Sequence, residues 1–331
     1  MRFSFILMLL GTIVGVAHAS DAELTAAIQN VRSACGGIGA ELSDMKKMAG
    51  INTAVTGVGT VAGGVALGTG IAKMGVDEKA DELEAALMAE VEKLKKMDAE
   101  AGGEFTFVDV SMIPLSEGGI GSVEYGDEED RVELVQSIEE KQKELDKLTK
   151  KSEVLGDVRT GSLATATVAN IAGAVIAGNN RVKGDLKAQI DECLMSVKTL
   201  SNVRMQARMN GVASDADLQQ AENIVRACDE WSMVDISSIN KKSSGATISS
   251  GIGATLGLTG TVTSVMANSD STRADNSDAG KAKEKNLNLA SNILAGGTTV
   301  AGGVATVFNA TQISAIKRAV TVADKCEEAL R

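Results

Sequence analysis

Four long stretches of the chain carry no charged residue, and they constrain the fold more than any other feature. They cover residues 48–72, 160–180, 243–269 and 286–316, and they consist largely of Gly, Ala, Val, Thr and Ser. Each is long enough to cross a bilayer as a helix, which takes about 20 residues. The chain has a single proline, Pro114, so very long helices are permitted. We therefore predict an all-α fold.

Small residues recur at every fourth position inside these charge-free segments. Spacing by four places residues on one face of a helix. Side chains of one carbon or none let two helix backbones approach closely, as in membrane helix pairs, and the gain is dispersion and weak Cα–H···O contact. The positions expected to pack in this way are Gly59, Gly63, Gly64, Gly68, Ala169, Gly173, Ala177, Gly253, Gly257, Gly297, Ala301 and Ala305.

The chain also reads as two related halves. NVRSAC at residues 30–35 precedes two lysines and a Gly-rich run, and NIVRAC at residues 223–228 precedes the same features. Each half then has a second small-residue segment that leads to another cysteine. We predict two duplicated helical hairpins, at residues 20–212 and 213–331, whose arms are rich in Gly and Ala.

The first hairpin carries a long insertion, residues 75–159. Residues 77–100 and 130–155 are charged stretches with apolar residues at helical spacing, which indicates an antiparallel coiled coil. The segment between them predicts a small β-structured or irregular tip. It contains Phe105, Phe107 and Tyr125, so we interpret it as a contact tip for a partner; an ordinary loop is the alternative.

The four cysteines are expected to form two disulfides, because an even number in an exported chain is typical of disulfide bonding. Hairpin arms of equal length bring their bases together, which favours Cys35 with Cys193 and Cys228 with Cys326. Pairing across the halves, Cys35 with Cys228 and Cys193 with Cys326, is the alternative. No CxxC is present, so neither a redox-active dithiol nor a Cys-only zinc site is expected.

Residues 1–19 have the order of features found in a secretory signal peptide. Arg2 precedes an apolar core, and Ala17, His18 and Ala19 form a small-x-small cleavage site. The apolar run is short for a membrane span, so we expect cleavage after Ala19 rather than a retained anchor. The protein is then exported, to the periplasm or the cell envelope.

Composition excludes several classes of function. The formal charge is −11, and loss of Arg2 makes it −12, which argues against nucleic acid and against binding anionic lipid by charge alone. The only histidine, His18, lies in the signal peptide. The mature chain therefore lacks imidazole for catalysis or metal binding. We expect no catalytic, cofactor or metal site, and no enzyme activity.

The sequence leaves two environments open for the charge-free segments. Their length favours a membrane, because a soluble helix usually carries charge on its outer face. Their low content of Leu, Ile and Phe, and the lack of an aromatic belt, argue the other way. In the soluble alternative, four helices pack as a tight bundle in which small residues face one another and Thr, Ser and Asn face water.

The runs GVGTVAGGVALGTG at residues 57–70 and GIGATLGLTG at 251–260 resemble the glycine-zipper segments of bacterial envelope proteins. That resemblance implies close helix pairing and membrane association. The expected function is that of a non-enzymatic, membrane-associated envelope protein that presents its coiled-coil arm for protein interaction. The expected partners are membrane lipid, another envelope protein or a second copy of the chain. The alternatives are a secreted pore-former or translocator, similar to α-helical pore-forming toxins, and a soluble periplasmic rod.

Overall fold

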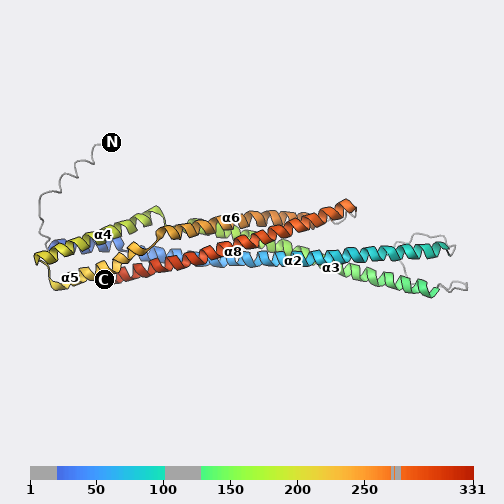
Figure 1. Ribbon diagram of the computed structural model, residues 1–331, viewed down its shortest axis with the longest axis horizontal. Helices are drawn as coiled ribbons and strands as arrows, with labels where there is room; N and C mark the ends of the chain where they lie inside the picture. Colours follow the sequence, from blue (N-terminus) through green and yellow to red (C-terminus); the bar gives the residue numbers. More distant parts are fainter. Residues whose placement is uncertain (1–20, 101–127, 270–271, 273–276) are drawn as a thin grey trace, which may run out of the picture. The chain divides into compact units, whose positions relative to one another are not determined.

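The computed structural model describes residues 21–100, 128–269, 272 and 277–331, and these are helical apart from short turns, with no strand among them. The predicted all-α class is confirmed. The signal peptide and the tip residues Phe105, Phe107 and Tyr125 lie outside the described residues. The elements are α1 (Asp21–Cys35), α2 (Ile38–Glu100), α3 (Glu128–Asn179), α4 (Gly184–Asn210), α5 (Asp215–Cys228), the 3-10 helix η2 (Asp229–Met233), α6 (Ile236–Ala267) and α8 (Asp278–Ala329) (Figure 1).

The helices end where particular residues favour a turn. Gly37, with φ of 86°, separates α1 from α2, and Gly211, with φ of 64°, ends α4 in the left-handed conformation that glycine adopts without strain. The Ser214 hydroxyl accepts a hydrogen bond from the Asp217 amide and caps the start of α5. The Asp235 carboxylate accepts one from the Ser238 amide at the start of α6.

The two halves of the chain differ where their second arms approach the cysteines. Helix α8 runs without interruption from its charge-free segment to Cys326. In the first half, the helix stops between α3 and α4, and the side chain of Asn240 holds the connecting backbone. Its carboxamide accepts a hydrogen bond from the Val182 amide at 2.8 Å and donates one to the Val182 carbonyl at 3.2 Å.

The chain forms two compact units. The first unit contains residues 21–60, 168–254 and 300–331, among them the cap, which we define as α1, α4, α5 and η2. Within the cap, α1 packs on α4, and α4 packs on α5 and η2 (Figure 1). Its core resembles that of a soluble protein, with large apolar side chains inside. The cap contributes Trp231, Leu24, Leu200 and Ile224 to this core, and α2, α6 and α8 contribute Ile38, Leu42, Ile239 and Ile316.

The second unit contains residues 61–167 and 255–299. Here α2 and α3 lie side by side, joined by hydrogen bonds from Lys141 and Ser137 to Glu90 and from Ser152 to Asp77. Lys281 of α8 pairs with Glu84 of α2 at 2.8 Å. The apolar core is small, with Ala66, Leu163 and Ala295 at its centre.

Candidate functional site

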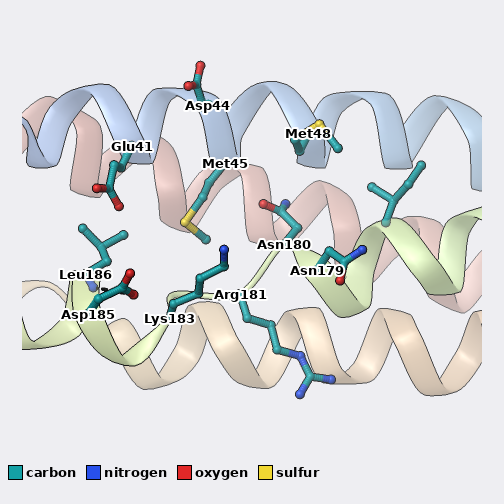
Figure 2. Close-up of a pocket in the computed structure, with 11 residues that line it drawn as sticks. Glu41, Asp44, Met45, Met48, Asn179, Asn180, Arg181, Lys183, Asp185 and Leu186 are labelled. Atoms are coloured by element: carbon teal, nitrogen blue, oxygen red, sulfur yellow. Dashed lines mark hydrogen bonds between the residues drawn. The ribbon is translucent and has the colours of Figure 1, made fainter.

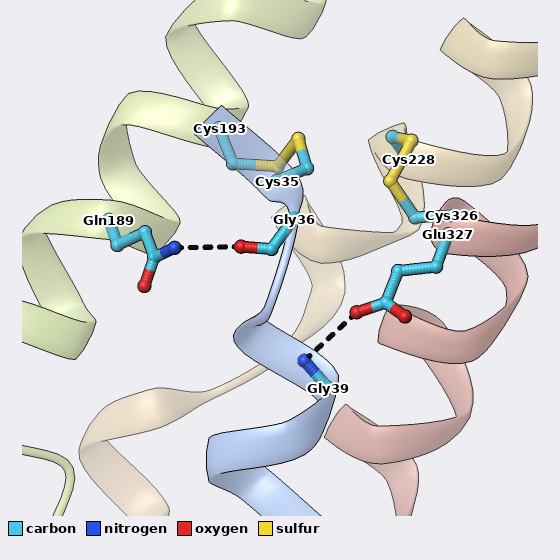
Figure 3. The surroundings of a disulfide bond; sticks show 8 residues. All are labelled: Cys35, Gly36, Gly39, Gln189, Cys193, Cys228, Cys326 and Glu327. Atoms are coloured by element: carbon cyan, nitrogen blue, oxygen red, sulfur yellow. Dashed lines mark hydrogen bonds between the residues drawn. A yellow bond between two sulfur atoms is a disulfide. The ribbon is translucent and has the colours of Figure 1, made fainter. Parts of the chain in front are cut away.

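Two disulfides join the elements around the cap. Cys35 is bonded to Cys193 and Cys228 to Cys326, the same pairing that the sequence favoured (Figure 3). They close loops of 158 and 98 residues, and each contributes about 5 kcal/mol in the chain-entropy treatment of loop closure. All four cysteines are buried, so the bonds lie inside the cap core.

The two disulfides are neighbours in space. The Sγ atoms of Cys35, Cys228 and Cys326 lie within 4.8 Å of one another. Such proximity resembles a metal site, but a sulfur that is already in a disulfide has no thiolate to offer a metal. Two hydrogen bonds fix the backbone beside them: Gln189 donates to the Gly36 carbonyl at 2.9 Å, and the Gly39 amide donates to Glu327 at 3.3 Å (Figure 3).

In the charge-free segments, successive buried residues are separated by three and four positions in alternation. In α2 the buried positions are 52, 56, 59, 63, 66, 70 and 73, and in α6 they are 243, 246, 250, 253, 257, 260, 264 and 267. This is the 3.5-residue period of helices that pack along a continuous seam. The residues on the seam are mostly Gly, Ala, Ser, Thr and Asn, so the helices meet through small side chains.

Most of the predicted packing residues lie on these buried faces. Gly59, Gly63, Ala169, Gly173, Ala177, Gly253, Gly257, Ala301 and Ala305 are buried, and Gly297 is half-buried beside Leu256. A Cβ added to Gly63 would lie 3.3 Å from the Cα of Thr299, and one added to Gly257 would lie 3.4 Å from that of Thr167. No room is left for a side chain at either contact.

The prediction was wrong for Gly64 and Gly68. Both are exposed, and a Cβ added to either meets no atom within 4 Å. Gly64 directly follows seam residue 63, and Gly68 lies midway between seam residues 66 and 70, so the period of four selects both although they face outward. The sequence reasoning also missed close approaches at Gly70, Gly156, Gly245, Gly260 and Gly302. The alternating three-and-four spacing is the signal that finds Gly70 in α2 and Gly260 in α6.

The interior of the first unit is polar where its helices are charge-free. Asn52 donates to the Asn309 carboxamide oxygen at 2.8 Å, and Asn309 donates to the Thr56 hydroxyl at 3.3 Å. Asn170 and Ser250 are fully buried, yet their side-chain polar atoms have no hydrogen-bond partner. Polar side chains therefore point inward, whereas the soluble alternative expected them to face water.

The interior of the second unit holds buried cations. Lys73 is fully buried and pairs with Asp77 at 2.7 Å and Glu284 at 3.3 Å. Arg159 is also fully buried, and it donates to Ser264 at 3.0 Å and Asn288 at 2.8 Å. Buried charges of this kind need partners, because their removal from water is costly.

The outer faces of the same helices are aliphatic. Val61 and Val168 are 68% and 67% exposed, and Ile293 and Val300 are 66% and 67% exposed. The threonine hydroxyls of these helices donate hydrogen bonds to the backbone carbonyl four residues earlier, as that of Thr69 and many others do. The charge-free segments are thus apolar outside and polar inside, the reverse of the cap.

Three helical stretches of the described residues are long and apolar enough to cross a membrane, judged by length and composition. They lie within Asp21–Met97, Asp130–Asn210 and Ala279–Ala329. The charge-free segment of α6, which is richer in Gly, Ser and Thr, is not among them. The disulfides suggest an oxidising compartment, and three of the helices are long and apolar enough to span a membrane.

Comparison of the chain with models of known protein families, with curated proteins and with solved structures found no match.

Proposed function

We propose that this is an exported, non-enzymatic protein of a cell envelope whose charge-free helices insert into a membrane. The observation that carries the proposal is the reversed polarity of these helices, with aliphatic side chains outside and Asn, Ser and Thr inside. In water, exposure of a large aliphatic side chain forgoes about 1.5–3 kcal/mol relative to burial. In lipid the same side chains are in contact with hydrocarbon, and it is the polar groups that must be satisfied internally.

The small-residue seams supply helix association of the glycine-zipper kind. Lipid gives helices no hydrophobic reason to associate, so close backbone approach through Gly and Ala is what holds them together. The segment of α6 enters as a packed partner of its neighbours: Gly253 faces Asn170, Gly257 faces Thr167, and Gly260 faces Leu294. Two duplicated hairpins account for this set of four segments, although α3 and α8 end differently.

Beyond the charge-free segments, we propose that α2 and α3 form an antiparallel coiled-coil arm for protein interaction. The ion pair between Glu90 and Lys141 and the burial of Leu134 and Ile138 support this arrangement. Phe105, Phe107 and Tyr125 belong to the connecting segment and are the proposed contact residues for another envelope protein or a second copy.

Carbonate extraction tests the membrane proposal. We expect the wild-type protein to stay with membranes at high pH, and to migrate faster on a non-reducing gel than after reduction. Replacement of Val168 and Val300 by Asp would place charges on the lipid face, at about 2.5–3.5 kcal/mol each on insertion scales, and release the protein. The matched control replaces Met195 and Met209 of the cap, 67% and 73% exposed, by Asp and should remain bound. Release of the wild type would contradict the proposal.

A pore-former is the second candidate, and the polar interior with unpartnered Asn170 and Ser250 favours it. Leakage of a dye from liposomes separates the two. A pore-former added from solution releases the dye, whereas a resident envelope protein reconstituted in the same liposomes leaves them sealed.

A further inference from the structure

A groove opens in the first unit where the charge-free segments of α2 and α3 end. It has a volume of about 420 Å³ and lies between α2, the end of α3 and the start of α4. Met45, Met48 and Ile176 give it an apolar wall on the side of the charge-free segments (Figure 2). Its other lining residues are mainly charged or carry amides, so the groove is apolar at one end and ionic at the other.

The ionic end of this groove carries both signs of charge. Lys183 and Glu41 point into the space between α2 and the connecting backbone, and Arg181 lies at its edge (Figure 2). Asp185 adds a further carboxylate, whereas Asp44 is paired with Lys47 at 3.0 Å and points away from this space in Figure 2. Within the described part of the chain, Arg181, Lys183 and Glu41 form no ion pair. Opposite charges therefore line one cavity without neutralising one another.

A second groove of about 420 Å³ repeats this chemistry in the other half of the chain. It lies between η2, the start of α6 and α8, where the charge-free segments of α6 and α8 end. Lys242 and Arg318 supply positive charge and Asp235 supplies negative charge, whereas the Glu230 carboxylate is paired with Lys325 at 2.8 Å. Met233, Val234 and Val322 line its apolar part. The same combination at corresponding places argues for a common ligand.

We propose that each groove binds the headgroup of a zwitterionic aminophospholipid, such as phosphatidylethanolamine. The phosphodiester would pair with the basic residues, Lys183 and Arg181 in the first groove and Arg318 and Lys242 in the second. The primary ammonium would donate to the carboxylates, Glu41 and Asp235 among them. The acyl chains would follow the aliphatic faces of the charge-free helices. The inference rests on the proposed membrane insertion.

The charges distinguish this ligand from other lipids. A phosphatidylglycerol headgroup brings a phosphate and neutral hydroxyls but no positive charge, so the carboxylates stay opposed to it, in a protein whose net charge is already negative. A phosphatidylcholine headgroup has a quaternary ammonium, which donates no hydrogen bond to a carboxylate. Both should bind less well than phosphatidylethanolamine in the same grooves.

Native mass spectrometry of the purified full chain in detergent tests the proposal by counting bound lipids. With equal amounts of the three phospholipids present, we expect up to two phosphatidylethanolamine molecules per chain and at least fivefold less of the other two. The variant Arg181→Gln/Lys183→Gln should bind only one, and combination with Lys242→Gln/Arg318→Gln should leave none. The matched control, Lys150→Gln/Lys151→Gln on the exposed side of α3, should still bind two.

A milder substitution guards against a folding defect. Glu41→Gln keeps the shape of the groove and should weaken phosphatidylethanolamine binding there severalfold, whereas phosphatidylglycerol binding should stay the same or rise, because one opposing carboxylate is removed. Equal retention of the three lipids, or loss of binding in the control variant, would overturn the proposal while membrane insertion stands. Failure of insertion itself would appear separately, as release of the wild type by carbonate.

Discussion

At the scale of single residues, two adjacent glycines of α2 differ in whether they pack against another helix. Gly63 faces Thr299, whose hydroxyl lies 2.7 Å from a Cβ placed on the glycine, whereas Gly64 faces open space. We expect Gly63→Ala to lower the free energy of unfolding by about 1–3 kcal/mol through overpacking. Gly64→Ala should be neutral or raise it by up to about 1 kcal/mol, since alanine favours the helix.

Thermal unfolding in detergent, followed by far-ultraviolet circular dichroism, measures both variants against the wild type. Equal midpoints for Gly63→Ala and Gly64→Ala would mean that the seam tolerates a methyl group, and that close backbone approach does not hold these helices together. Because the two residues are neighbours on one helix, differences in depth or helix propensity do not confound the comparison.

At the scale of the helix, the sequence predicted which segments are helical and long, but it did not predict which face is buried. A spacing of four selects Gly59 with Gly63 and Gly64 with Gly68 equally well, although only the first pair lies on the seam. In a charge-free segment, hydrophobicity does not identify the buried face, because aliphatic side chains are normally assigned to the interior. Here Asn52 and Asn309 are inside and Val61 is outside.

The break between α3 and α4 depends on a contact between residues that are distant in the sequence, so the local sequence does not predict it. The backbone of Val182, just after α3, is held by Asn240, 58 residues further along the chain, so the first half breaks there whereas α8 continues. The disulfide pairing, in contrast, followed from arm lengths alone, because two arms of similar length return their bases to the same place. Lys73 and Arg159 flank the charge-free segments in sequence, and nothing in that position indicated burial.

The contact between α2 and α3 should depend on pH through Glu90. Its hydrogen bond from Lys141 lowers the pKa of the carboxyl below 4.5. A carboxyl with a depressed pKa in the folded state stabilises it above the unfolded pKa, and this stability is lost as pH falls through the folded pKa. We therefore expect Glu90→Gln to destabilise the protein at pH 7 and to approach the wild type as the pH falls through the lowered pKa of Glu90 in the folded state.

Glu92 provides the control for this titration. Its ion pair with Lys96 lies on the exposed side of α2, where the two side chains are 69% and 72% exposed. Exposed pairs contribute little, so Glu92→Gln should change the unfolding midpoint slightly at any pH. A constant difference between Glu90→Gln and the wild type from pH 3 to 7 would show that the Lys141 contact is not a source of pH dependence.

At the scale of the whole molecule, the chain combines two kinds of interior: an apolar core in the cap, cross-linked by disulfides, and small polar seams in the charge-free segments. These interiors depend on different forces, so they should respond differently to reduction. Loss of both disulfides removes about 5 kcal/mol per bond from the cap, a large share of the stability of a typical domain. The seams contain no cysteine and, in detergent, keep the apolar surroundings that their outer faces need.

Trp231, the only tryptophan of the chain, makes this difference measurable. It is 2% exposed in the cap core beside Cys228, so unfolding of the cap shifts its fluorescence to longer wavelength. In moderate urea with detergent, we expect the variant with all four cysteines replaced by Ser to show that shift while most of its helicity remains. All four cysteines are replaced, because a thiol left free at Cys35, Cys228 or Cys326 lies within 4.8 Å of a sulfur of the other disulfide and would exchange with it. If the fluorescence shift and the loss of helicity occurred together, the two interiors would instead unfold as one cooperative structure.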